Sequence, residues 1–235
     1  GAPSAYNGHL ASFTASYLGI YINCQKDDNI SYNTIISSTL TGSAAVVRGI
    51  QKSYRTSTSS GTTTPTGTFT YSIRNNFIKL STNLPNTSHV DGILTENPSS
   101  GSSSLYINNN TIEGMSIQYS ASSNQMKGIN NSSAVSILSI SNNIIRGNTS
   151  TSTAGSFTAI NQSGNVITSI DINNNQIGDS TTGGDAITYL YSPLGLSSIL
   201  RGIYNSNTNG TLHVNIKSNN IQGFRQLGTS TTAPH

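Results

Sequence analysis

The stretch Ile172-Asn-Asn-Asn175-Gln-Ile177 decides the fold, because its pattern, Ile-x-x-Asn-x-Ile, occurs six times along the 235 residues. The other five copies are Ile30-Ser-Tyr-Asn33-Thr-Ile35, Ile73-Arg-Asn-Asn76-Phe-Ile78, Ile107-Asn-Asn-Asn110-Thr-Ile112, Ile140-Ser-Asn-Asn143-Ile-Ile145 and Ile216-Lys-Ser-Asn219-Asn-Ile221. A pattern that returns at intervals of this length is typical of a chain that winds into a solenoid.

The spacing of the repeat defines one coil. Successive asparagines of the pattern lie 43, 34, 33, 32 and 44 residues apart, so a coil contains about 33 residues. The two long intervals carry insertions, near 54–68 and 179–198. A second signature, Gly-Ile in five copies and Ala-Ile in one, lies between the copies of the first. β-Branched residues fill the periodic positions and no segment has a helical period, so the sequence predicts an all-β fold. We expect one parallel β-helix domain over 1–235, with about six coils.

Alternation along the strand before each Ile-x-x-Asn-x-Ile segment assigns its two faces. The position two residues before the first isoleucine is apolar in five coils and should point inward, whereas its neighbours are mostly polar and should point outward. The first coil departs from this rule, because Asp28 takes the inward position, and we expect an irregular or partly uncovered strand there. The inward residues of the other coils are Tyr71, Leu105, Leu138, Ile170 and Val214.

The recurring asparagine has a structural interpretation. Strands of neighbouring coils lie about 4.8 Å apart, so equivalent residues stack directly above one another. An asparagine amide both donates and accepts, so each side chain can bond the next one along the axis. Asparagine also tolerates the left-handed backbone that turns between strands often need. We therefore predict a structural asparagine ladder of Asn33, Asn76, Asn110, Asn143, Asn175 and Asn219.

The composition narrows the class of protein. Only 8% of the residues are charged, the net charge is +3, and the eleven Lys and Arg are scattered along the chain, so nucleic-acid binding is not expected. The single cysteine excludes internal disulfides and thiolate metal sites. No run is long and apolar enough for a membrane span. This Ser-, Thr- and Asn-rich composition favours an exported protein, secreted or at the cell surface.

The two signatures together resemble the repeats of right-handed parallel β-helix proteins, of the kind found in large secreted and cell-surface, adhesin-like proteins of Bacteroidetes-type bacteria. The resemblance covers Tyr17 to Gly223. It implies a right-handed coil, secretion, and either contact with polysaccharide or other cell-surface components or a role as a stalk or adhesin. The motif residues build the coil, so the resemblance is specific for the fold and says little about activity.

The sequence offers no catalytic set and no cofactor or metal site. Asp27 and Asp28, the one adjacent acidic pair, resemble the paired aspartates of polygalacturonase-like hydrolases, but the Gly-His-Gly and Arg-Ile-Lys segments of that family are missing. We expect the pair to cap the first coil. The four histidines lie far apart in the repeat, without metal-ligand spacing. No catalytic residue is therefore predicted.

Another column of residues follows from the Gly-Ile signature. The residue before each glycine or alanine should face outward on consecutive coils, and its charges alternate in sign. We expect a surface charge ladder, with a basic catalytic patch for a lyase as the alternative. The column is Arg48, Asp91, Lys127, Thr158 and Arg201.

We expect a non-catalytic structural module, acting as spacer, adhesin or filament component. The alternative is a β-helix that binds or degrades polysaccharide, as a lyase or glycosidase does. Near the C-terminus the chain resembles the earlier run from Ile78 to His89, so we expect further coils or domains beyond His235, with a homo-oligomer or filament also open. If the chain instead binds or degrades polysaccharide, we expect the sugar contacts to come from outward-facing Tyr106, Asn131, Gln162, Tyr204 and Asn205.

Overall fold

The computed structural model describes residues 16–23, 27–37, 46–53, 67–82, 89–96, 103–117, 125–150, 156–179, 188–191, 199–207, 209 and 211–228. Within these ranges the chain forms strands and no helix, and every strand pair is parallel. The strands form four sheets, and each sheet takes at most one strand from each coil.

Within each sheet the strands lie side by side in the order of the chain. Sheet 1 contains β1 (Ser16–Asn23), β4 (Val46–Ser53), β8 (His89–Glu96), β12 (Gln125–Asn131), β16 (Ser156–Gln162) and β20 (Ile199–Asn205). Sheet 2 contains β2 (Asn29–Ser31), β5 (Phe69–Arg74), β9 (Ser103–Asn108), β13 (Val135–Ser141), β17 (Val166–Asn173) and β21 (His213–Lys217). Sheet 3 contains β3 (Thr34–Ile36), β6 (Phe77–Lys79), β10 (Thr111–Glu113), β14 (Ile144–Arg146), β18 (Gln176–Ile177) and β22 (Asn220–Ile221). Sheet 4 contains β7 (Ser81–Thr82), β11 (Ser116–Ile117), β15 (Thr149–Ser150), β19 (Thr188–Tyr191) and β23 (Arg225–Gly228).

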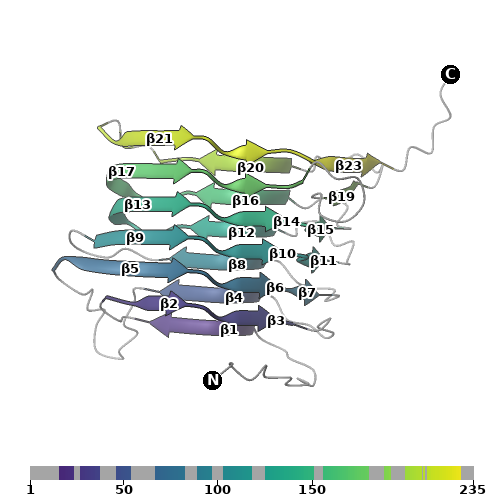
Figure 1. The fold of residues 1–235 in the computed structure, drawn as a ribbon, viewed down its shortest axis with the longest axis horizontal. Helices are drawn as coiled ribbons and strands as arrows, with labels where there is room; N and C mark the ends of the chain where they lie inside the picture. The colour runs from purple at the N-terminus through teal and green to yellow at the C-terminus, as the bar shows by residue number, and fades with distance from the viewer. Residues whose placement is uncertain are drawn as a thin grey trace.

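The chain therefore winds as a right-handed parallel β-helix of six coils, as predicted. Sheets 2 and 3 form the near face in Figure 1, and sheet 1 runs behind them in the opposite direction, one level higher with each turn. Coil 1 consists of β1, β2 and β3, and coils 2 to 6 each add one strand to all four sheets. Only two strand signatures per coil are visible in the sequence. The short strands of sheets 3 and 4 complete the turn.

The two isoleucines of the repeat form the centre of the core. In coils 1 to 5 both are at most 7% exposed, and most are fully buried. They stack in register from coil to coil, Ile30 on Ile73 in sheet 2 and Ile35 on Ile78 in sheet 3. The inward column of Tyr71, Leu105, Leu138 and Ile170 is also buried. A narrow apolar interior thus repeats along the axis, which explains how a chain with 33% hydrophobic residues builds a core.

The asparagine ladder is confirmed, and it runs without a break through six coils. In each step the Nδ2 of one asparagine donates to the Oδ1 of the next, at 2.8–3.0 Å. The backbone N–H of the same residue donates to that Oδ1 as well, at 2.9–3.1 Å. From Asn76 onward, Nδ2 also donates to the carbonyl of the first isoleucine of the preceding coil, at 2.7–3.0 Å. The ladder closes the corner between sheets 2 and 3.

The left-handed backbone at this corner belongs to the residue before the ladder asparagine. The ladder asparagine itself does not have a positive φ in any coil. A positive φ of 54–60° occurs at Tyr32, Asn75, Asn109, Asn142, Asn174 and Ser218. The left-handed residue turns the chain, and the ladder residue can then direct its amide into the interior. Four of these six residues are asparagines, the side chain that tolerates this backbone best after glycine.

The Gly-Ile signature marks a close approach between coils. A Cβ built on Gly49 would lie 2.6 Å from the carbonyl oxygen of Gly92 and 2.6 Å from Cγ2 of Ile78. A Cβ on Gly92 would likewise lie 2.6 Å from the carbonyl oxygen of Gly128. Sheet 1 therefore packs too tightly against the sheet 3 isoleucines for a larger residue in these coils. This explains why glycine recurs at the centre of the sheet 1 strands.

The structure describes the two predicted insertions to different extents. The first falls between β4 and β5, where residues 54–66 lie outside the described residues. The second was predicted across 179–198, but Thr188–Tyr191 within it is β19, which pairs in register with β15 and β23. The extra length therefore does not fill the whole interval, because part of it is an ordinary strand of sheet 4.

Candidate functional site

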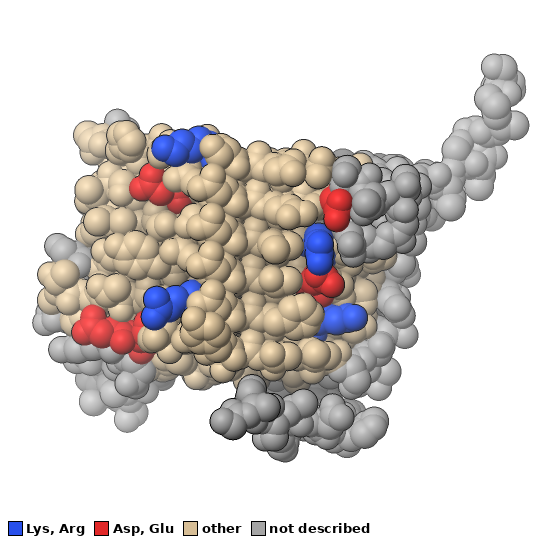
Figure 2. Space-filling view, viewed as in Figure 1, with Lys and Arg blue, Asp and Glu red and all other residues tan. Residues whose placement is uncertain are grey.

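The outer face of sheet 2 is flat and mostly polar. The residues that alternate with the buried ones point outward and stack in columns, as the alternation predicts. The central column consists of Asn29, Ser72, Tyr106, Ser139, Asp171 and Asn215. The column beside it consists of Ser31, Arg74, Asn108, Ser141, Asn173 and Lys217. Figure 2 shows few charged side chains on this face, confined to its two ends.

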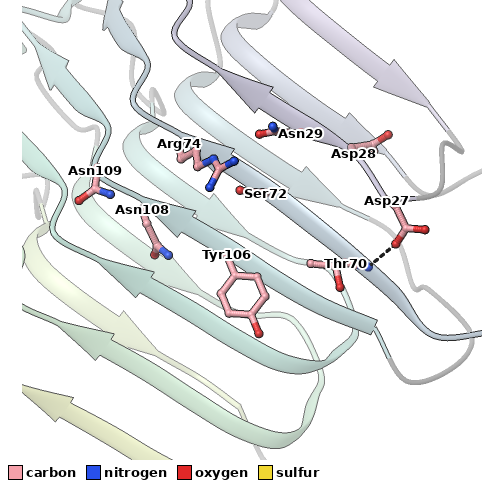
Figure 3. Close-up of a pocket in the computed structure, with 9 residues that line it drawn as sticks. All are labelled: Asp27, Asp28, Asn29, Thr70, Ser72, Arg74, Tyr106, Asn108 and Asn109. Carbon is pink, nitrogen blue, oxygen red and sulfur yellow. Dashed lines mark hydrogen bonds between the residues drawn. The ribbon is translucent and has the colours of Figure 1, made fainter.

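A hollow of about 500 Å³ lies on this face over the first three coils. Its lining comes from the end of the β1–β2 connection and from β2, β5, β9 and the turn after β9. Figure 3 shows Tyr106 and Thr70 at one end and Asn108 and Asn109 at the other, with Arg74 and Ser72 between β2 and β9. The lining residues are Asp27, Asp28, Asn29, Thr70, Ser72, Arg74, Tyr106, Asn108 and Asn109.

Tyr106 is placed so that its ring remains accessible. Its register neighbours are Ser72 on β5 and Ser139 on β13, both small, so no large side chain stacks on either side of the ring in this column. The tyrosine is half-buried. A half-buried ring between small polar neighbours offers an apolar surface with a hydroxyl at its end, and tyrosine is enriched at interfaces for this reason. Tyr106 therefore presents an accessible aromatic ring in the hollow.

The polar groups around Tyr106 differ in how firmly they are held. Oδ1 of Asn108 accepts from the backbone N–H of Ser141 at 3.1 Å and from its hydroxyl at 2.9 Å. This leaves the Nδ2 of Asn108 as a donor with a fixed orientation. Oδ1 of Asp27 accepts from the backbone N–H of Thr70 at 2.8 Å. Arg74 is exposed, and no carboxylate in the described part of the chain forms an ion pair with it.

Asp28 belongs to the interior. Its carboxylate forms an ion pair with Lys52 of β4, whose side chain is only 1% exposed. The Lys52 ammonium also lies 4.8 Å from the ring centroid of buried Tyr71. The prediction that Asp28 takes the inward position is confirmed by this contact, and the buried lysine balances its charge. Lys52 was not predicted from the sequence, although it lies two residues after buried Ile50 and so on the same face of the strand.

Three predicted surface residues are wrongly placed. Asn131 and Gln162 are fully buried, because they continue the inward column that begins with Ile22 and Lys52. Thr95 donates to Asn131 at 2.6 Å, and Asn131 donates in turn to Gln162. Asn205 is the next residue of the same column and is half-buried. These residues form a second polar ladder at the corner between sheets 1 and 2, and burial makes Asn131 and Gln162 unavailable to a sugar.

Tyr204 does face outward, on sheet 1, with 37% of its surface exposed. Its ring lies 4.3 Å from the guanidinium carbon of Arg201, a cation–π contact along one strand. Tyr106 and Tyr204 lie on different sheets, so they do not form one site. Of the predicted sugar contacts, only Tyr106 lies in the hollow.

The predicted charge ladder on sheet 1 is partly buried. The guanidinium Nε of Arg48 lies 3.5 Å from Oδ2 of Asp91, whose residue is only 3% exposed. Burial raises the pKa of Asp91, and this outweighs the hydrogen bond from Asn130 and the nearby charges of Arg48 and Lys127, which lower it. Asn130 donates to Oδ1 of Asp91 at 3.0 Å. Burial also lowers the pKa of His89 on the same strand. Thr158, the fourth residue of the column, is buried. Asp91 and Thr158 therefore occupy outward positions of their strands but are not exposed to solvent.

A second charge ladder lies on the outer edge of sheet 3, where the sequence did not predict one. Arg146 forms an ion pair with Glu113 at 2.9 Å and with Asp179 at 3.9 Å. Lys79 ends β6, the strand that pairs with β10 from the coil below, and Figure 2 shows positive and negative side chains alternating along the right side of the near face. The side chains of Arg146 and Glu113 are each 31% exposed, so the pairs contribute little stability.

Comparison with known protein families, curated protein sequences and solved structures finds no match for this chain. Within the ranges that the structure describes, no helix is long and apolar enough to cross a membrane. No three His, Cys, Asp or Glu side chains of those ranges converge as metal ligands do.

Proposed function

We propose that this chain is a non-catalytic structural and adhesive module of a secreted or cell-surface protein. The observation that carries the proposal is the unbroken asparagine ladder. In coils 2 to 5 the side-chain amide of each ladder asparagine is hydrogen-bonded to the ladder asparagine of the coil before and of the coil after. Side chains that recur in every coil are thus engaged in holding the coils together. A rod with one repeating internal bond pattern suits a spacer or stalk, because the same contacts join every pair of neighbouring coils.

The acidic residues support the same proposal. Seven of the eight lie in the described part of the chain, and each has a partner that engages its carboxylate. Catalysis by a glycosidase needs two carboxylates directed at one substrate position, and a general acid or base must be able to exchange its proton there. The partners are the Thr70 N–H for Asp27, Lys52 for Asp28, Arg48 for Asp91, Gln51 for Glu96, Arg146 for Glu113 and Asp179, and Asn215 for Asp171.

The non-catalytic role has a direct test. The protein is incubated with a soluble β-glucan, xylan and polygalacturonate, and the solution is followed for new reducing ends and for unsaturated products that absorb in the ultraviolet. We expect neither product above the level of a heat-unfolded control. Turnover of any of the three polymers that disappears on unfolding contradicts the proposal.

A second function, binding of a polysaccharide chain, is supported by the hollow around Tyr106. The ring can pack against the apolar face of a sugar, while Asn108 and Arg74 offer donors to its hydroxyl or carboxylate oxygens. The hollow lies open on a flat sheet, so a long polymer can cross it without being enclosed. This arrangement suits an adhesin that holds a polymer weakly at many sites.

The matched variants are Tyr106→Ala and Tyr204→Ala, because both tyrosines are outward-facing and they lie on different sheets. We expect wild-type protein to be retarded in gels that contain one of the three polymers. Tyr106→Ala should weaken the affinity by about tenfold, the loss of one good aromatic contact. Tyr204→Ala should bind as the wild type does. An equal effect of both changes, or none, contradicts a site at Tyr106.

A further inference from the structure

The face of coil 6 that points along the axis is apolar and open. Val214, Ile216 and Ile221 occupy inward positions of the repeat, yet they are 44%, 45% and 44% exposed. Their register equivalents in coils 2 to 5 are at most 1% exposed. Side chains that are buried everywhere else in the rod are therefore half in water at this end. Contiguous exposed apolar surface of this kind marks an interaction site.

The hydrogen bonds of the asparagine ladder all run in one direction along the axis. In coils 1 to 5 the backbone N–H and Nδ2 of the ladder asparagine both donate to the Oδ1 of the next coil. Asn219 is the last of the ladder, and its Nδ2 donates only to the carbonyl of Ile172, at 2.7 Å. Its Oδ1 already accepts two bonds from Asn175. Coil 6 therefore presents donors at this corner, and the group that satisfies them is a side-chain carbonyl placed above Asn219.

The strand edges add a third requirement. β20, β21, β22 and β23 are each the last strand of their sheets, so one edge of each is unpaired among the described residues. We propose that the face of coil 6 docks a parallel β-coil of the Ile-x-x-Asn-x-Ile kind. Its isoleucines cover Ile216 and Ile221, its asparagine oxygen accepts from Asn219, and its strands extend the sheets. This inference is independent of any ligand in the hollow.

A second copy of the chain does not meet all of these requirements. Two copies joined face to face through coil 6 would direct the free donors of one Asn219 at those of the other. A copy stacked head to tail would have to present Ile30 and Ile35 of its coil 1, but these are only 4% and 7% exposed. Ile30 and Ile35 of coil 1 are already covered, whereas Ile216 and Ile221 of coil 6 are not. The occupant is therefore a parallel coil from outside these six.

The experiment extends the chain with a copy of one of its own coils. A copy of residues 125–150, which form the strands of coil 4, is added directly after His235. Nine residues, 227–235, then separate Gln226 from the copy, the same number as separate its register partner Tyr189 from Ile199. In the matched control the copied Asn143 is replaced by Leu, which is similar in size and lacks the carbonyl. Amide hydrogen exchange is measured residue by residue in all three proteins.

We expect the added coil to slow exchange across β21 and β22 by about tenfold or more, with the Asn219 N–H among the protected amides. With leucine in the copy, β21 should stay protected while the Asn219 N–H exchanges as it does in the unextended chain. Unchanged exchange in β21 on extension overturns the proposal, and so does equal protection of Asn219 in the control. The unextended protein should be monomeric by sedimentation, and a dimer protected at β21 would overturn the choice of occupant.

Discussion

Replacing Asn143 with alanine tests the ladder where it is most deeply buried. The amide of Asn143 is fully buried and makes four hydrogen bonds. Its Nδ2 donates to the Ile107 carbonyl at 2.8 Å and to Asn175 at 3.0 Å, and its Oδ1 accepts from the N–H and Nδ2 of Asn110 at 2.9 and 3.0 Å. Truncation removes all four bonds, so the backbone N–H of Asn110 and the Ile107 carbonyl lose their Asn143 partner in a dry interior.

The expected cost follows from these bonds. A hydrogen bond contributes about 1 kcal/mol net, and a buried group left unpaired costs about 1–3 kcal/mol, so Asn143→Ala should destabilise the protein by about 3–5 kcal/mol. Asn219→Ala is the matched control, because it removes three bonds of the same ladder at an end that water reaches. There water replaces the lost partners, and we expect about 1 kcal/mol.

Urea unfolding followed by far-ultraviolet circular dichroism measures both variants. The midpoint of Asn143→Ala should fall by about 1–2 M, and that of Asn219→Ala by less than half as much. Equal shifts for the two variants, or a shift of Asn143→Ala within error of zero, would refute the view that the internal ladder holds the coils together.

Three further predictions concern other features of the coil. Gly92→Ala places a methyl group 2.6 Å from the Gly128 carbonyl oxygen and should lower the free energy of unfolding by about 2 kcal/mol or more, measured in the same urea assay; wild-type stability would show that sheet 1 yields easily. Lys52→Met leaves the Asp28 carboxylate buried without its cation and should cost about 3–5 kcal/mol, whereas adding Asp28→Leu should recover most of the loss; a double variant as unstable as the single one contradicts a balanced pair. Asp91 has a raised pKa in the folded state, so the folded chain binds this proton more tightly than the unfolded chain does. Its contribution to stability is complete below the unfolded pKa and is lost as the pH rises through the folded pKa. Relative to Asp91→Asn, the melting temperature of the wild type should therefore rise on acidification from pH 7, and a difference that stays constant with pH rules this out.

The fold was predictable because its determinants are local and repeated. Two isoleucines and one asparagine at fixed spacing give both the strand faces and the stacking register, and the structure confirms both. The left-handed residue could not be located from the sequence, because two polar residues stand side by side in most coils. Sequence alone does not show which of Asn109 and Asn110 turns the chain and which one bonds along the axis. The two-residue strands of sheet 4 carry too short a pattern to be recognised.

The candidate site was harder to predict, because polarity was taken for exposure. Asn131 lies two residues after buried Ile129, so alternation alone places it inward. Stacking on Gln162 satisfies its amide there, and this stabilisation depends on the neighbouring coil. The ion pair of Asp28 and Lys52 has the same origin, since only the winding of the chain brings the two residues together. The outward placement of Tyr106 was predictable, because its own strand alternates cleanly between inward and outward residues.

The measurement that tests the central claim most directly is the footprint of a bound polymer on the protein. The claim is that the recurring residues are scaffold and that binding takes place in the hollow on sheet 2. Amide exchange of the protein is compared with and without the polymer that retards it most in gels. We predict slower exchange confined to β5 and β9, around Arg74 and Tyr106, with the amides of the asparagine ladder unchanged. A footprint on sheet 1 around Tyr204, or no footprint with any of the three polymers, contradicts the account.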